Sequence, residues 1–85
     1  MPEICRFYGI IITMYLPDHN PPHFHVRYND HHATIDIKTG RVVGDMPRRA
    51  LRLVHDWLDE HQQELMDNWY RMENGETVMT IAPLD

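Results

Sequence analysis

The chain has 85 residues, of which 42% are hydrophobic and 25% are charged, a composition typical of one globular domain rather than of a disordered chain or of two domains. No apolar run approaches the roughly 20 residues that cross a bilayer, and the first residues lack the basic-then-apolar order of a secretory signal. Cys5 is the only cysteine, which excludes an internal disulfide and favours a reducing compartment. We therefore expect a single cytoplasmic domain over residues 1–85.

The net charge of −5 is distributed unevenly along the chain. Residues 1–52 hold seven of the eight basic residues and five acidic ones, for a net charge of +2. Residues 53–85 hold one basic residue and eight acidic ones, for a net charge of −7. This balance argues against strong non-specific binding to duplex nucleic acid, which needs many phosphate contacts, but it leaves room for a local basic patch that contacts RNA.

The first half of the chain predicts strands. Residues 10–16 are rich in β-branched side chains and predict a first strand. Residues 17–22 contain three prolines and predict an ordered loop. Residues 23–28 and 33–38 each alternate between apolar and polar positions, which predicts two strands that pair across a turn at residues 29–30.

The second half of the chain predicts one long helix. Residues 41–44 suit a short further antiparallel strand, after which Pro47 opens the helix. Residues 74–75, an Asn-Gly pair, predict the end of the helix, and a break near residues 61–62 would divide it in two. Residues 77–81 suit an edge strand. The apolar stripe of the helix comprises Ala50, Val54, Trp57, His61, Leu65, Trp69 and Met72, widened by Leu51, Leu58 and Met66.

These elements predict an α+β fold in which three or four mostly antiparallel strands pack against one long C-terminal helix that is either continuous or kinked. A stripe of about seven helical turns is longer than so small a sheet needs, so a dimer is one way to bury the remainder. The predicted core comprises Phe24, Val26, Ile35, Ile37, Val54, Trp57, Leu58, Leu65 and Trp69.

Three histidines, His19, His23 and His25, fall within seven positions and form the most distinctive chemical feature of the sequence. His23 and His25 share a strand face because side chains alternate along a strand. A two-residue turn at residues 29–30 places Asp36 opposite His23, and a four-residue loop places it opposite His25. In either register a carboxylate lies beside a histidine, where it favours the imidazolium form and fixes the tautomer.

Four interpretations of this histidine cluster stay open. Two histidines, His23 and His25, could act as base and acid in RNA cleavage with Asp36 orienting one of them. A divalent metal, the only cofactor that the sequence suggests, could bind His23 and His25 with His19 or Asp36 as the third ligand. The histidines could form a binding surface, or they could serve with Asn20 to hold the proline loop. The sequence does not decide whether the protein is an enzyme.

The remaining histidines and the tryptophans are expected to be structural. His31 and His32 would flank the hairpin turn, and His61 falls in the apolar stripe of the helix as a half-buried core residue. Trp57 and Trp69 lie on the same stripe and are expected in the core rather than on a base-stacking platform.

Arginines gather at the predicted start of the helix. Arg48, Arg49 and Arg52 lie where the helix macrodipole disfavours positive charge. Together with Arg27 and Arg41 they could bind phosphate or an acidic partner. The alternative is a solvated or salt-bridged face.

The chain resembles the bacterial domain-of-unknown-function family 4160. The most specific likeness is the run His-Asn-Pro-Pro-His-Phe-His at residues 19–25. The likeness covers nearly the whole chain. The matching segments are residues 2–4, 6–10, 14–15, 18–26, 35–37, 47–51, 64–65, 68–69 and 81–84, together with Trp57 and His61.

The resemblance implies a small cytoplasmic protein encoded beside another short gene, of a kind suspected to form toxin–antitoxin modules and sometimes labelled as transcriptional regulators. It implies a small cognate protein partner, and no activity or catalytic residue can be carried over from it. We expect a toxin-like component that acts on RNA. The alternatives are a non-catalytic protein- or nucleic-acid-binding module, such as a regulator or antitoxin partner, and a histidine-based metal-binding protein.

Overall fold

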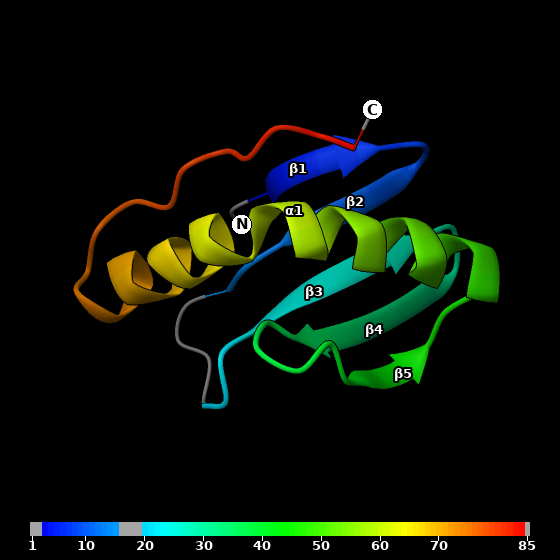
Figure 1. The fold of residues 1–85 in the computed structure, drawn as a ribbon, viewed down its shortest axis with the longest axis horizontal. Helices are drawn as coiled ribbons and strands as arrows, with labels where there is room; N and C mark the ends of the chain where they lie inside the picture. The colour runs from blue at the N-terminus through cyan, green and yellow to red at the C-terminus, as the bar shows by residue number, and fades with distance from the viewer. Residues whose placement is uncertain (1–2, 16–19, 85) are drawn as a thin grey trace.

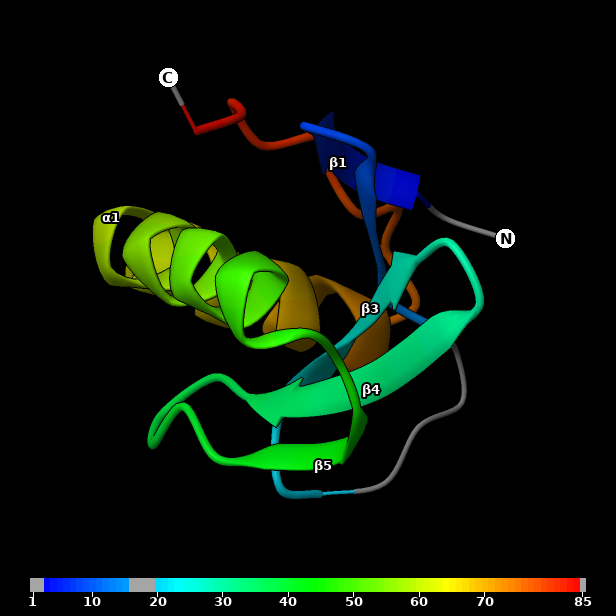
Figure 2. The same cartoon turned by 90° about the vertical axis from the view of Figure 1, so that its right-hand side faces the viewer.

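The computed structural model describes residues 3–15 and 20–84. The elements follow in the order β1 (Glu3–Phe7), β2 (Ile10–Thr13), β3 (His23–Tyr28), β4 (His31–Asp36), β5 (Val42–Asp45) and α1 (Arg48–Glu73). The strands form one sheet in the order β1-β2-β3-β4-β5, with every neighbouring pair antiparallel, and α1 lies across one face of it (Figures 1 and 2). The predicted α+β fold is therefore confirmed, with five strands in place of three or four.

The additional strand is β1, which the sequence pattern did not predict. Its pairing with β2 shifts register between Glu3 and Cys5, so that the neighbouring residues Ile4 and Cys5 are both buried. A bulge of this kind breaks the strict alternation by which a half-buried strand is recognised. The strand is joined to β2 by a two-residue turn at Tyr8 and Gly9, both of which have positive φ.

The hairpin of β3 and β4 has the tighter of the two predicted registers. Asn29 adopts φ 52°, a left-handed conformation that asparagine tolerates better than most residues, and it closes a two-residue turn with Asp30. The strand β4 consequently begins at His31, two residues before the predicted position. The two-residue turn places Asp36 opposite His23.

The two faces of the sheet differ in character. One face, which packs against α1, is apolar, and all nine residues of the predicted core are buried. The opposite face, called here the outer face, carries His23, His25 and Arg27 from β3, because these positions alternate with the buried Phe24 and Val26.

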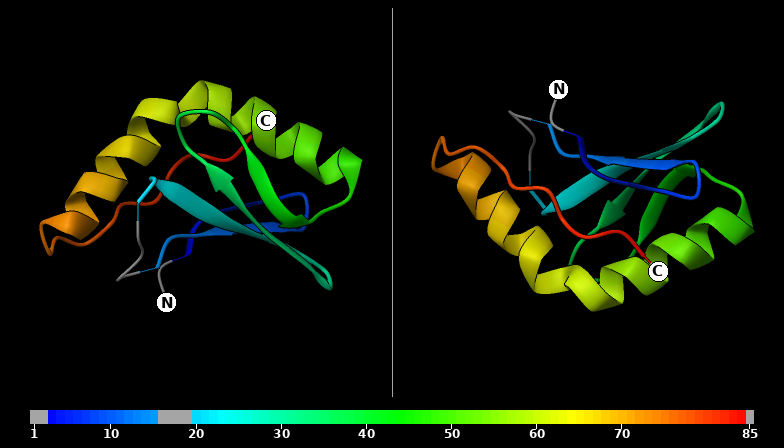
Figure 3. Two further views of the ribbon diagram at one scale, coloured as in Figure 1. Left: turned by 90° about the horizontal axis from the view of Figure 1, so that it is seen from below. Right: turned by 90° about the horizontal axis from the view of Figure 1, so that it is seen from above.

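The helix α1 is bent at His61, whose backbone angles of φ −124° and ψ 19° are not helical. Figure 3 shows how the bend curves α1 around the sheet. The predicted break near residues 61–62 is thus confirmed, and the helix ends at Glu73, before Asn74 and Gly75, as predicted. Within the described ranges, no helix is both long and apolar enough to cross a bilayer.

Residues 76–84, the C-terminal strap, run back past α1 to β1 (Figure 1). Only one backbone hydrogen bond joins the described part of the strap to β1, from Ile81 N–H to the Ile4 carbonyl at 2.8 Å. The predicted strand at residues 77–81 is therefore wrong. Side chains of α1 hold the strap instead, because Asn68 bonds both backbone groups of Met79 and Trp57 donates to the carbonyl of Ala82.

Candidate functional site

Three imidazole rings, those of His23, His25 and His32, form a continuous row on the outer face. The ring centroids of His23 and His25 are 5.3 Å apart, and those of His25 and His32 are 5.5 Å apart. The antiparallel register pairs His25 with Thr34 and Arg27 with His32, so His32 is the diagonal neighbour of His25 across the hairpin. We call this group the histidine row.

His25, at the centre of the row, contacts His32 directly. Its Nδ1 lies 3.4 Å from His32 Nε2, a long hydrogen bond in which one nitrogen must donate and the other accept. The pair can therefore be neutral or can share one added proton, whereas two imidazolium rings would place donors against each other. The ring of Tyr15 meets His25 edge to face, with centroids 4.4 Å apart.

His23 is fixed by its loop and by the helix. Its Nδ1 donates to the carbonyl of Pro21 at 2.9 Å, because a carbonyl oxygen can only accept. Pro21 follows Asn20 through a cis peptide bond. His23 is the first residue of β3, and at this end of the strand its ring also packs against Trp69, in the part of α1 that follows the bend, with centroids 5.4 Å apart, so one end of the histidine row meets the helix. These contacts set the orientation of the first ring in the row.

The carboxylate of Asp36 closes the turn that follows β4. Its Oδ1 accepts the backbone N–H groups of Lys38 at 2.8 Å and of Thr39 at 2.9 Å. Partial burial alone would raise the pKa of Asp36, but the hydrogen bonds from Thr39 and Lys38 outweigh it and lower that pKa below its usual value. Asp36 lies opposite His23 in the ladder, as the two-residue turn predicted, and its role in orienting a histidine stays a prediction.

The part of the chain that the structure describes contains no complete metal site. His19, one of the three predicted metal ligands, lies outside the described residues. Within residues 3–15 and 20–84, no three histidine, cysteine, aspartate or glutamate side chains gather closely enough to hold a metal ion. The predicted alternative set of His23, His25 and Asp36 is therefore not brought together within these residues.

A polar hollow of about 580 Å³ adjoins the histidine row on the outer face. Arg27 lies beside it, paired in the sheet with Ile11 on one side and His32 on the other, and forms no ion pair with any described residue. Arg6 is bound to Glu3 at 2.7 Å, and this hydrogen bond lowers the pKa of Glu3. The hollow is lined by Glu3, Arg6, Ile11, Thr13, Tyr15, Arg27, Asn29, Asp30, His31 and His32.

The five arginines singled out in the sequence do not form one patch. Arg48, Arg49 and Arg52 are exposed on the first turns of α1, whereas Arg27 lies on the outer face of the sheet, which is the face away from α1. Arg41 precedes β5 and follows Gly40, whose carbonyl is bonded by His55 of α1. None of the three helix arginines forms an ion pair within the described part of the chain.

Cys5 is buried beneath the sheet. Burial raises the pKa of its thiol, because a thiolate is disfavoured away from water. A buried, protonated thiol suits the packing role expected for Cys5.

The family described as a domain of unknown function, DUF4160, matches residues 9–70. The chain belongs to this family. No curated protein and no solved structure matches the chain. The resemblance inferred from the sequence is confirmed, and the matched residues of this DUF4160 domain include the histidine row and all of α1 except its last three residues, while β1 and the C-terminal strap lie outside the match.

Two members of the site in this DUF4160 protein, His32 and Tyr15, were missed by sequence reasoning. His32 was expected only to flank the hairpin turn, but the two-residue turn makes it part of β4 and alternation then directs it to the outer face. The signal in the sequence was the spacing between His25 and His32, which places both side chains on the same face of the hairpin when the turn has two residues. Tyr15 follows β2 in the chain, and no local pattern shows that its ring reaches His25.

Proposed function

We propose that this DUF4160 protein is a toxin-like component of a bacterial two-gene module and acts on RNA at the outer face of its sheet. The contact between His25 Nδ1 and His32 Nε2, beside Arg27, is the observation that carries the proposal. Two adjacent imidazoles can supply one base and one acid, which is the pair that cleavage of an RNA phosphodiester requires. The proposal implies a cytoplasmic protein with a small cognate partner.

The proposed reaction needs only groups of this chain and the RNA. A neutral imidazole of the pair takes the proton of a ribose 2′-hydroxyl, whose oxygen attacks the adjacent phosphorus. The bond from phosphorus to the 5′-oxygen breaks, and the protonated imidazole gives its proton to that oxygen. The products are a 2′,3′-cyclic phosphate and a free 5′-hydroxyl. Arg27 binds the phosphate as its charge rises in the transition state.

The surroundings of the pair favour a single strand over a duplex. Imidazole and tyrosine rings along the row offer stacking surfaces for exposed bases, which a paired helix does not present. The net charge of −5 and the few arginines on the outer face suit a short contact rather than a long phosphate track. The bond of His23 to Pro21 supports a positioning role for His23, and Asp36, which lies opposite it in the ladder, would orient a histidine of the row.

Induced expression in a bacterial host tests this proposal, with the wild type compared with His25→Gln and His32→Gln. The expected result is growth arrest with RNA fragments that end in 2′,3′-cyclic phosphate, and loss of both effects in each variant. His55→Gln is the matched control, because His55 bonds the Gly40 carbonyl on the helix side of the sheet and glutamine can keep that bond. Soluble wild-type protein without arrest or cleavage, or cleavage that survives both variants, would contradict the proposal.

The second candidate is a non-catalytic binding module, such as a regulator or antitoxin partner. The exposed arginines at the start of α1, which form no ion pair with any residue that the structure describes, favour it, because guanidinium groups bind carboxylates and phosphates. Arrest that persists in the histidine variants but disappears in Arg48→Glu/Arg52→Glu would support this candidate over the ribonuclease.

A further inference from the structure

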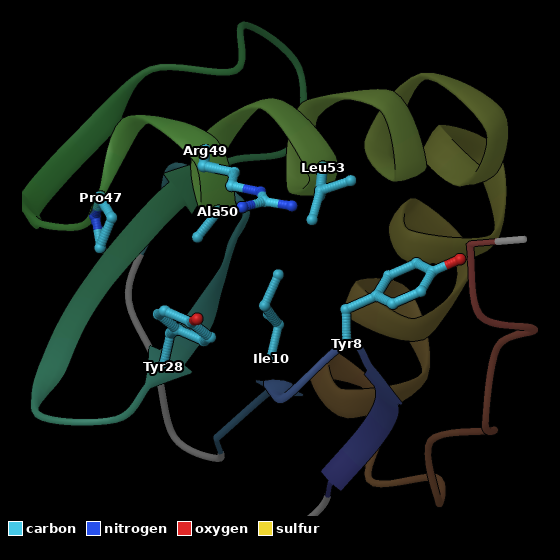
Figure 4. A pocket seen from close by; sticks show the side chains of 7 residues that line it. All are labelled: Tyr8, Ile10, Tyr28, Pro47, Arg49, Ala50 and Leu53. Atoms are coloured by element: carbon cyan, nitrogen blue, oxygen red, sulfur yellow. The ribbon is translucent and has the colours of Figure 1, made fainter.

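A second hollow lies on the helix side of the sheet, where the turn between β1 and β2 meets the start of α1 (Figure 4). Its volume is about 540 Å³, within the range of small-ligand and side-chain pockets. We call it the turn–helix pocket. It is lined by Tyr8, Ile10, Tyr28, Pro47, Arg49, Ala50 and Leu53.

The interior of the turn–helix pocket is apolar. Ile10 and Ala50 are buried and form its base, and Leu53 is half-buried above them. Figure 4 shows Tyr8 and Tyr28 on either side of Ile10, with the guanidinium group of Arg49 above the gap between them. A group that fills this space would therefore contact aliphatic and aromatic carbon and meet a cation at the rim.

Tyr8 is held in a conformation that its residue type disfavours. It has φ 49°, and Gly9 after it has φ 79°, so both central residues of the hairpin turn are left-handed. Such turns favour asparagine, aspartate and glycine at the first position, where a bulky side chain is strained. The tyrosine ring is nevertheless 62% exposed and forms a wall of the pocket. A residue such as Tyr8, whose backbone conformation is unfavourable for its type, is often found at a binding site.

The rim of the pocket is positively charged. Arg49 lines it, and Arg48 and Arg52 are exposed on the same two turns of α1. The first turn of α1 contains no acidic residue, and no described side chain neutralises these arginines within 4 Å. Guanidinium groups bind carboxylates in bidentate geometry, so the complement of this surface is an apolar side chain with carboxylates beside it.

We propose that the turn–helix pocket docks an acidic segment of a partner protein, which inserts one apolar side chain between Tyr8 and Tyr28 and places its carboxylates on the three helix arginines. Tyrosine and arginine are the residues that most often carry the binding energy of protein interfaces. The apolar base favours a peptide over RNA, because it offers few groups that could bond a base edge. The proposal goes beyond RNA cleavage, since the pocket lies on the other side of the sheet from the histidine row.

A displayed library of random peptides provides the probe, with selection on the wild-type protein and on a Tyr8→Asn/Arg49→Glu variant in parallel. Asparagine suits the left-handed turn position, so Tyr8→Asn should keep the fold while it removes one wall of the pocket. Thermal melting checks that both proteins are folded. We expect the wild type alone to enrich peptides in which an aromatic or aliphatic residue is flanked by aspartate or glutamate.

The best enriched peptide, made synthetically, is then titrated against single variants. Tyr8→Asn and Arg49→Glu should each weaken its binding by about tenfold or more, as expected for contacts at the centre of an interface. Lys38→Glu is the matched charge reversal, because Lys38 is exposed but does not line the pocket. It should bind as the wild type does.

Four results would overturn the docking proposal: no enrichment over the variant selection, enrichment of neutral or basic peptides, binding insensitive to Tyr8→Asn and Arg49→Glu, or protection of the pocket by single-stranded RNA instead. Dimeric sedimentation mass that Arg49→Glu abolishes would assign the pocket to a second copy and would also overturn it. RNA cleavage is a separate measurement that depends on His25 and His32, so either proposal can fail while the other stands.

Discussion

Trp57 donates its indole N–H to the carbonyl of Ala82 at 2.8 Å, which ties the C-terminal strap to the middle of α1. Trp57→Phe keeps most of the buried ring but leaves that carbonyl without its donor, so we expect a loss of about 1–3 kcal/mol in the free energy of unfolding. Urea denaturation measures the loss, and faster hydrogen exchange of the Ile81 amide should accompany it.

Trp69→Phe is the matched control for this prediction. Trp69 is equally buried, but its indole nitrogen has no hydrogen-bond partner among the described residues. The same change in ring size there removes no bond, so Trp69→Phe should cost less than Trp57→Phe. Equal losses would show that ring volume, rather than the bond to Ala82, sets the cost at Trp57.

Asn68 is fully buried, and its side-chain amide bonds Met79 twice, donating to the Met79 carbonyl at 2.8 Å and accepting the Met79 N–H at 2.9 Å. Asn68→Leu removes both bonds and leaves two backbone groups of the strap unsatisfied, which should destabilise the protein by about 2–4 kcal/mol. Limited proteolysis should then cleave within residues 76–84 under conditions in which the wild type resists. Gln63→Leu, which removes only the surface bond to Asp67, should leave the strap protected.

Gly44 in β5 has φ 118°, and a Cβ atom there would lie 2.7 Å from the carbonyl oxygen of His32 and 2.9 Å from Ala33 Cα. Both neighbours are backbone atoms of β4, so Gly44→Ala must distort the ladder and should cost about 2 kcal/mol or more. Gly75→Ala is the comparison, because Gly75 has φ 74° but nothing within 4 Å, and only the conformational cost of about 1 kcal/mol applies. Thermal or urea unfolding should rank the two variants in this order.

The lowered pKa of Asp36 predicts a pH dependence of stability. Because its folded-state pKa lies below the unfolded value of 3.8, the ionised carboxylate stabilises the fold at any pH above that value. This contribution is lost as the pH falls below 3.8 and through the folded-state pKa. Asp36→Asn should therefore be less stable than the wild type at neutral pH, and the difference should shrink in acid. Urea denaturation across this range measures it, and a difference that stays constant with pH would contradict the account.

The elements that depend on local sequence patterns, namely the β3–β4 hairpin and α1, were predicted well. Alternation in residues 23–28 limited the hairpin to two registers, one of which pairs His23 with Asp36 as observed. The apolar stripe and the Asn-Gly stop predicted α1, with a break near residues 61–62 as one alternative. The strand β1 was missed because its bulge interrupts the alternation. The position of the strap was not predictable, because side chains of Trp57 and Asn68, distant in sequence, hold it.

The candidate site was harder to predict because it depends on contacts between strands. His25 meets His32 only in the register that the two-residue turn sets, and Tyr15 reaches His25 from outside β2. The sequence suggested that five arginines could act together. Sequence alone does not show on which side of the sheet each side chain lies, and Arg27 lies on the opposite side from the helix arginines.

The bond between Ile81 and Ile4 also bears on the order of folding. Every strand pairs with its neighbour in the chain, so the sheet can form through local contacts, which close quickly. The strap must instead reach β1 across a long stretch of intervening chain, and it can do so only after α1 has presented Trp57 and Asn68. During synthesis, the edge of β1 therefore stays exposed at least until the strap itself has left the ribosome.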